Sequence, residues 1–217
     1  MTRPIEIQNT ISRQSAESFY DWLGARYDWA EAFESRAKRI GLELLDMAPG
    51  QRILNAGSGT GKDHLKLLEA ISPGGQAVGL DLSWEMINLT RMRTGSPCLQ
   101  AIVESLPLQA QSFDRVFSSY VLDLIPGRDI GTVLAEFKRI LRPGGILVNV
   151  SLSRGHSLTS RAVIAAWLKV YETAPVACGG CRPVALYHLA KEAGFSRVMW
   201  EIVEQFAVPS EIVLAIN

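Results

Sequence analysis

Cysteine is scarce in this sequence, and its count is odd: the three residues are Cys98, Cys178 and Cys181. A secreted domain that depends on disulfides carries more cysteines, usually in even number. The chain also lacks a surplus of either charge, because 22 Lys and Arg residues balance 22 Asp and Glu residues. Proteins that hold a nucleic-acid backbone usually carry a basic surplus. These absences favour a reducing compartment and argue against a nucleic-acid partner.

Long hydrophobic runs are also missing. No apolar run approaches the roughly 18 residues that a membrane span requires. The first stretch, MTRPIEIQNTISRQ, has no apolar core of signal-peptide length. We therefore expect a cytoplasmic protein, with a peripheral membrane contact left open. The 217 residues contain no domain-sized repeat or linker, and they suit one α/β domain.

Strand-like and helix-like segments alternate from residue 51 onward. Residues 14–47 come first and show the apolar periodicity of a helix. The chain ends in two strand-like segments that are joined by a Pro-containing turn, which predicts an antiparallel hairpin. The expected strands are QRILNA, QAVGLDL, CLQAIV, FDRVFSSYVL, ILVNVSL, FSRVMWEIVEQF and PSEIVLAIN. This order predicts a mostly parallel sheet with helices on both faces and a ligand beyond the carboxyl ends of its strands.

The stretch ILNAGSGTGKDH places Gly57, Gly59 and Gly61 directly after the first of these strands. A phosphate-binding loop would need a glycine where Ala56 stands and a hydroxyl where Asp63 stands. The dinucleotide fingerprint GxGxxG would place the third glycine one residue later. These departures disfavour a triphosphate, and they make a nicotinamide-dependent oxidoreductase a weaker alternative. A tight strand-to-helix turn that binds nothing is the structural alternative.

The glycine loop and three further motifs resemble the class I S-adenosylmethionine-dependent methyltransferases. The first motif of that family is an apolar strand, an acidic residue, one spacer and GxGxG. ILNAGSGTG matches it, except that Asn55 replaces the acid. VGLDLS supplies Asp81 at the end of the next strand, and VESLP and FKRILRPGGILV are similar to later motifs. The resemblance covers about residues 20–152.

The resemblance implies a doubly wound, mostly parallel seven-stranded sheet with the C-terminal hairpin and an N-terminal helical lid. Residues 1–47 would form the lid, and residues 48–217 would form one cofactor-binding methyltransferase domain. The cofactor would be S-adenosylmethionine, which the reaction converts to S-adenosylhomocysteine.

The same resemblance assigns the cofactor contacts. Asn55 would lie near the α-ammonium, where it can accept a hydrogen bond without the charge of the usual acid. Asp81 would accept hydrogen bonds from both ribose hydroxyls. Ile102 stands where many family members carry an Asp, so the backbone N–H of Val103 would contact adenine instead. The residues expected to bind the cofactor are Asn55, Gly57, Ser58, Gly59, Gly61, Asp81, Leu82, Met86, Val103, Glu104 and Ser119.

Candidate residues for the methyl acceptor come from the N-terminal segment and from the ends of the later strands. Two Tyr-Asp-Trp triplets are seven residues apart, so a helix would present both tyrosine rings on one face unless Gly24 breaks it. In each case packing or helix capping is the structural alternative. The expected catalytic residues are Tyr27, Tyr120, Asp123 and His156, and the expected substrate contacts are Tyr20, Tyr27 and Arg182.

CGGCRP allows two interpretations: a zinc site, or a turn that presents Arg182 to an anionic substrate. Zinc would need two further ligands that the sequence does not place nearby, so we expect no metal.

The whole pattern is most similar to the ubiquinone/menaquinone C-methyltransferases, although YVLDL replaces their usual Gly-Leu-Arg-Asn. Phospholipid N-methyltransferases are the nearest rivals. We expect a small, lipophilic acceptor. Because Asn55 and Ile102 both depart from the family pattern, a catalytically degenerate S-adenosylmethionine-binding subunit is the alternative. The sequence does not specify an oligomeric state.

Overall fold

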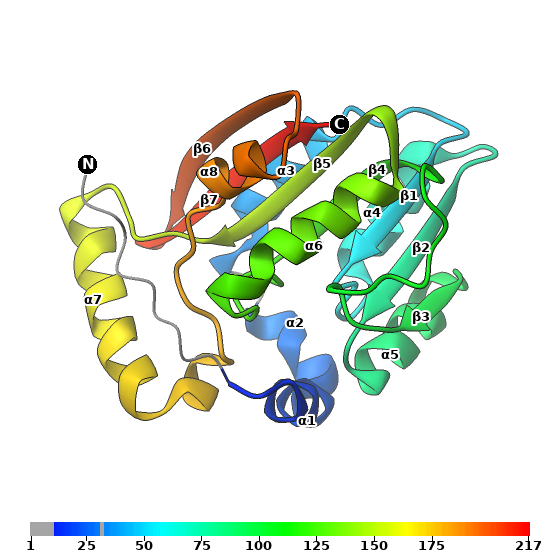
Figure 1. The fold of residues 1–217 in the computed structure, drawn as a ribbon. Coiled ribbons are helices and arrows are strands. Elements are labelled where there is room, and N and C mark those ends of the chain that lie inside the picture. The colour runs from blue at the N-terminus through cyan, green and yellow to red at the C-terminus, as the bar shows by residue number, and fades with distance from the viewer. Residues whose placement is uncertain (1–10, 31–32) are drawn as a thin grey trace.

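Seven strands form one sheet in the order β3-β2-β1-β4-β5-β7-β6 in a computed structural model that describes residues 11–30 and 33–217 (Figure 1). Strands β1 to β5 pair in parallel, and β7 runs antiparallel to both β5 and β6. The bounds are β1 Arg52–Ala56, β2 Gln76–Asp81, β3 Cys98–Gln100, β4 Phe113–Ser119, β5 Leu141–Leu152, β6 Arg197–Gln205 and β7 Val208–Ile216. The predicted sheet and its C-terminal hairpin are confirmed.

Helices cover both faces of this sheet. One core cluster joins the sheet to α6 and α8, and a second joins the opposite face to α3 and α4. Helix α5 packs beside α4 and against β2 and β3, while α7 stands at the left of Figure 1. The bounds are α3 Ser35–Leu44, α4 Lys62–Ile71, α5 Trp84–Thr94, α6 Gly127–Ile140, α7 Leu158–Thr173 and α8 Leu186–Glu192. None of the helices in the described part of the chain is long and apolar enough to span a bilayer.

The expected single helix over residues 14–47 is wrong in detail. It is divided into α1 (Arg13–Leu23), a 3₁₀ turn at Gly24–Arg26, α2 (Tyr27–Ala30) and α3. Gly24 ends α1 because its φ of +48° lies in the left-handed region, which a helix cannot continue through. The second Tyr-Asp-Trp triplet therefore begins a separate helix, α2.

Three strand predictions also need correction. Strand β4 ends three residues early because Tyr120 has a φ of +54°, and β3 stops at Gln100. The turn between β6 and β7 consists of Phe206 and Ala207, both with positive φ, while Pro209 is already paired in the ladder. Positive φ values at Tyr120 and at the two turn residues therefore decide the end of β4 and the position of the hairpin turn.

Strand order reverses between β1 and β4. The chain passes from β1 outward to β2 and β3, then returns to add β4 on the other side of β1. The loops after β1 and β4 therefore diverge and leave a crevice at the carboxyl ends of the sheet. Helices α1 and α2 lie at this end, at the bottom of Figure 1.

Candidate functional site

Two adjoining cavities occupy the crevice between β1, β2 and β4. The larger has a volume of about 380 Å³ and the smaller of about 60 Å³. Both are lined by Gly57, Asp81, Val121 and Leu124, so they meet at the carboxyl ends of β1, β2 and β4. The predicted location of a ligand site, beyond the first strand and its glycine loop, coincides with this pair of cavities.

The three loop glycines meet different surroundings. A Cβ on Gly57 would lie 2.1 Å from Val121 Cγ2, and one on Gly61 would lie 2.9 Å from the backbone of Thr90. A Cβ on Gly59 would find only the Tyr27 ring, at 4.0 Å, because it would project into the smaller cavity. Gly57 and Gly61 therefore allow close packing of the loop, and Gly59 leaves space for a ligand.

Asp81 links the loop to the next strand. One carboxylate oxygen accepts the Gly59 N–H at 2.9 Å, and the other accepts the Ser83 N–H at 3.0 Å. Burial raises the pKa of Asp81 to about 6 although these two hydrogen bonds oppose the shift. Asp81 lines both cavities, so a ligand that extends through them passes its carboxylate.

Asn55 lies at the end of β1 with a fully buried neighbour, His64. Its amide nitrogen is 3.4 Å from His64 Nδ1, and burial lowers the pKa of His64 to about 4, so the ring is neutral. A neutral imidazole has one donor and one acceptor nitrogen, and the Asn55 amide contains both a donor and an acceptor. Asn55 therefore pairs with a buried neutral ring while it lines the smaller cavity.

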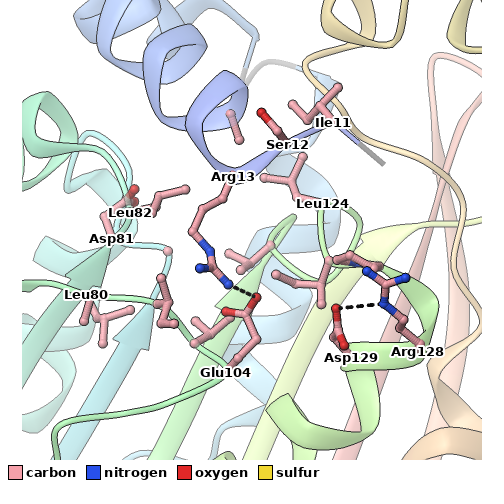
Figure 2. Close-up of a pocket in the computed structure, with 18 residues that line it drawn as sticks. Ile11, Ser12, Arg13, Leu80, Asp81, Leu82, Glu104, Leu124, Arg128 and Asp129 are labelled. Carbon is pink, nitrogen blue, oxygen red and sulfur yellow. Dashed lines mark hydrogen bonds and ion pairs between the residues drawn. The ribbon is translucent and has the colours of Figure 1, made fainter. Parts of the chain in front are cut away.

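The larger cavity runs toward the segment after β3 (Figure 2). Ile102, Val103 and Glu104 line it together with Leu82. Arg13 of α1 reaches across the opening to Glu104 at 3.2 Å. Met86, in contrast, is buried and lines only the smaller cavity. Leu82 and Met86, both expected to bind the cofactor, therefore lie in different cavities.

The two Tyr-Asp-Trp triplets bring their tyrosines together despite the break at Gly24. The rings of Tyr20 and Tyr27 are 6.1 Å apart, and both line the smaller cavity. The Tyr27 hydroxyl donates to Glu34 at 3.1 Å, and the Tyr20 hydroxyl donates to the carbonyl of Gly179 at 3.3 Å. The two rings therefore meet at the cavity, but not as one face of a single helix, because Gly24 divides that helix.

The aspartates of the triplets tie the N-terminal segment to the glycine loop and to α5. Asp21 accepts from Ser83 Oγ at 2.5 Å, just before α5. Asp28 accepts from Thr60 Oγ1 at 2.5 Å and from Arg93 at 3.0 Å. Burial alone would raise the pKa of Asp28, but these hydrogen bonds lower it. Each triplet thus places one aromatic ring at the smaller cavity and anchors one carboxylate on a neighbouring loop or helix.

Tyr120 and Asp123 follow β4, as expected, but their polar atoms face the protein interior. Tyr120 lines the smaller cavity with Ser119, yet its hydroxyl is 2.6 Å from Ser210 Oγ. Asp123 is fully buried and accepts the Leu152 N–H at 2.7 Å, and no described residue bonds its other oxygen. Burial raises the pKa of Asp123 well above its usual range. Asp123 lies behind the cavity wall and lines neither cavity.

His156 and Arg182 lie apart from both cavities. His156 is exposed before α7, and its backbone N–H donates to Glu204 at 3.1 Å. Arg182 is buried and donates to the carbonyl of Ile125 at 2.5 Å. The turn containing Arg182 therefore directs its guanidinium into the protein, which gives no support to the expected anion contact.

Lys38 and Asp63 are cavity residues to which the sequence analysis assigned no role. Lys38 of α3 and Asp63 of α4 both line the smaller cavity, and both are buried. The sequence does contain a pattern that indicates Lys38. This residue lies seven positions, or two helical turns, before Leu45, which is fully buried, and so it lies on the inward face of α3. Asp63 is indicated by its position in the first helical turn after the glycine loop, where a side chain lies close to the loop.

Comparison with known proteins finds similarity to methyltransferases. The methyltransferase domain family matches residues 54–149, which include the glycine loop and Asp81. Malonyl-[acyl-carrier protein] O-methyltransferase from Serratia marcescens is 31% identical over 68% of this chain and 56% of its own length. The ubiquinone/menaquinone biosynthesis C-methyltransferase of Syntrophotalea carbinolica is 30% identical over 65% of this chain and 62% of its own length. The chain thus spans less than two thirds of these curated relatives.

A solved structure supports the fold. An S-adenosylmethionine-dependent methyltransferase from Thermotoga maritima superimposes with a TM-score of 0.70 and 20% sequence identity. The match covers 93% of this chain and 99% of that protein. The likeness therefore extends to the N-terminal segment and the hairpin, which lie outside residues 54–149.

Proposed function

Because the chain resembles S-adenosylmethionine-dependent methyltransferases in sequence over residues 54–149 and in fold, we propose that it transfers the methyl group of S-adenosylmethionine to a small, lipophilic acceptor. The observation that carries the proposal is the position of Gly59. Its missing side chain opens onto a cavity beside Asp81, where backbone can approach a ligand that has no phosphate.

The described residues fit this cofactor. Asp81 would hold the ribose at the junction of the two cavities. The larger cavity would take the adenine between Leu82 and the backbone of Val103, with Ile102 and Glu104 at its edge. The other proposed cofactor contacts lie in the loop and the smaller cavity: Asn55, Gly57, Ser58, Gly59, Gly61, Met86 and Ser119.

When bound, the cofactor supplies a methyl group on a positively charged sulfur, which leaves as a neutral thioether. The chain's task is to align a nucleophile with that methyl group and to exclude water. We assign this task to Tyr20, Tyr27 and Tyr120, which line the smaller cavity. Aromatic rings also stabilise a nearby positive charge through their faces.

The residues that line the smaller cavity also indicate the class of methyl acceptor. Three tyrosine rings and the apolar side chains of Val121 and Leu124 favour an acceptor that presents a flat, apolar part to the smaller cavity, whose volume of about 60 Å³ leaves the remainder of the acceptor outside it. The relatives named above methylate quinone precursors and a malonyl-acyl carrier protein, so a quinone-like acceptor is our first candidate. An acyl thioester or a phospholipid amine is the alternative.

Calorimetry tests the cofactor assignment. S-Adenosylmethionine and S-adenosylhomocysteine should bind with dissociation constants in the micromolar range, while NAD should not bind. The glycine spacing is the reason, because it lacks the turn that a pyrophosphate needs. Binding of NAD in place of both sulfur compounds would indicate an oxidoreductase.

Cofactor affinity should depend on pH around 6. The ribose hydroxyls of the cofactor would donate hydrogen bonds to Asp81 and so stabilise its ionised form. Below its pKa of about 6, Asp81 must therefore release a proton when the cofactor binds. Affinity should therefore fall by up to about tenfold for each pH unit below 6 and be constant above it. Calorimetry between pH 5 and 8 checks this, and Asp81→Asn should remove the step. An unchanged step in Asp81→Asn would assign it to another group.

Tyr27 tests the proposed role of the N-terminal segment as a lid. Tyr27→Phe keeps the ring beside Gly59 but removes the hydroxyl that donates to Glu34. We expect a several-fold slower transfer of labelled methyl at an unchanged melting temperature, because the nucleophile loses part of its alignment. Tyr27→Ala should lower both the rate and the melting temperature. A fully active Tyr27→Phe would reduce Tyr27 to a packing residue.

A further inference from the structure

Two charged side chains that do not belong to β1 line the smaller cavity. Asn55 at the end of β1 is neutral, but Asp63 lines the cavity from the first turn of α4, and Lys38 lines it from α3. A carboxylate in the first turn of a helix is stabilised by the N-terminal end of the helix dipole. The cavity therefore contains one anion and one cation that belong to neither the glycine loop nor β2.

These two charges face each other. Lys38 Nζ is 3.5 Å from one carboxylate oxygen of Asp63, and the two side chains are 6% and 9% exposed. The other oxygen of Asp63 contacts Lys66, whose side chain is 56% exposed. Lys66 therefore pairs with Asp63 from the solvent side, whereas the pair with Lys38 is interior.

Lys38 has further partners that would hold it in the cavity without Asp63. Its ammonium is 3.3 Å from Glu34 and lies 5.4 and 5.8 Å from the ring centroids of Tyr27 and Tyr120. Asp81, the other carboxylate that lines this cavity, already accepts two backbone N–H groups and adjoins the larger cavity. Asp63 is thus the carboxylate that a cation in the smaller cavity would meet.

We propose that Asp63 and Lys38 form the subsite for the amino-acid end of the cofactor. Asp63 pairs with the α-ammonium, and Lys38 pairs with the α-carboxylate. An α-amino acid end carries one charge of each sign on neighbouring atoms, and the Lys38–Asp63 pair presents the complementary charges. Asp63 thereby supplies the negative charge that Asn55 lacks. The inference rests on the proposed function, since it presupposes that S-adenosylmethionine binds.

Three ligands separate the two assignments by calorimetry. S-Adenosylmethionine has both charged groups, decarboxylated S-adenosylmethionine keeps the ammonium, and 5′-methylthioadenosine has neither. Asp63→Asn should weaken binding of the first two ligands about tenfold or more and leave 5′-methylthioadenosine within about twofold. Lys38→Met should weaken S-adenosylmethionine alone.

Glu69→Gln is the matched control, because it removes one negative charge from the exposed side of the same helix. It should leave all three affinities unchanged. Unchanged binding of 5′-methylthioadenosine also shows that a variant is folded. Equal losses for all three ligands, or no loss for any of them, would overturn the inference. If the unmodified protein binds none of the three ligands, the proposed function itself fails.

Discussion

Replacing Gly59 with valine is expected to abolish detectable binding of S-adenosylmethionine. The Gly59 Cβ position opens onto the smaller cavity, so the valine side chain would fill space that the ligand needs. Calorimetry on the variant and the unmodified protein measures the loss. We expect the loss to exceed that of any substitution at a side chain that only lines the cavity.

Backbone strain must be separated from this effect, since Gly59 has a φ of +54°. Gly95→Val is the matched control: Gly95 has a φ of +68°, and its Cβ would meet no atom of the described residues within 4 Å. Both variants should lose a similar amount of stability, about 1–2 kcal/mol. Only Gly59→Val should lose the ligand. Equal affinity of Gly59→Val and the unmodified protein would remove the glycine loop from the binding site.

Asp81→Ala is expected to weaken cofactor binding far more than Asn55→Ala. Asp81 would lose two charge-assisted hydrogen bonds to the ribose, about 3 kcal/mol together, and would also release the Gly59 N–H. Asn55 would lose one neutral hydrogen bond to the ligand. Calorimetry gives both affinities, and melting temperatures show whether the buried Asn55–His64 contact matters for folding instead. A larger loss of affinity at Asn55 would reverse the two assignments.

The parts of the site that the sequence predicts are those in which a short motif determines its own geometry. The strand, glycine loop and helix around Gly59 form one local unit, and Asp81 ends the neighbouring parallel strand. Parallel strands bring such ends together whatever the remainder of the chain does. The position of the cavities was predictable for this reason.

Contacts between distant segments were not predictable in the same way. Asp21 and Asp28 contact α5 and the glycine loop only because Gly24 breaks the N-terminal helix at that point. Lys38 faces the cavity because α3 packs on the same side of the sheet as α4. A single sequence contains no record of these pairings.

Two residues after β4 and β5 were predicted to be catalytic, but their side chains do not line either cavity. Asp123 and His156 follow strand ends, as catalytic residues of this fold class often do, but one is buried behind the wall and the other is exposed. The positive φ of Tyr120 turns the chain inward and decides the first case. Position along the chain indicates which edge of the sheet a residue occupies, but not where its side chain points.

Transfer of a labelled methyl group is the most direct test of the central claim. The protein is incubated with S-adenosylmethionine labelled on its methyl group and with cell extract, and the products are divided into organic-soluble and aqueous fractions. We predict that label appears in an organic-soluble molecule together with an equal amount of S-adenosylhomocysteine, and that Gly59→Val produces neither. If the unmodified protein binds S-adenosylmethionine but transfers no label to any fraction, the account of a methyltransferase is contradicted.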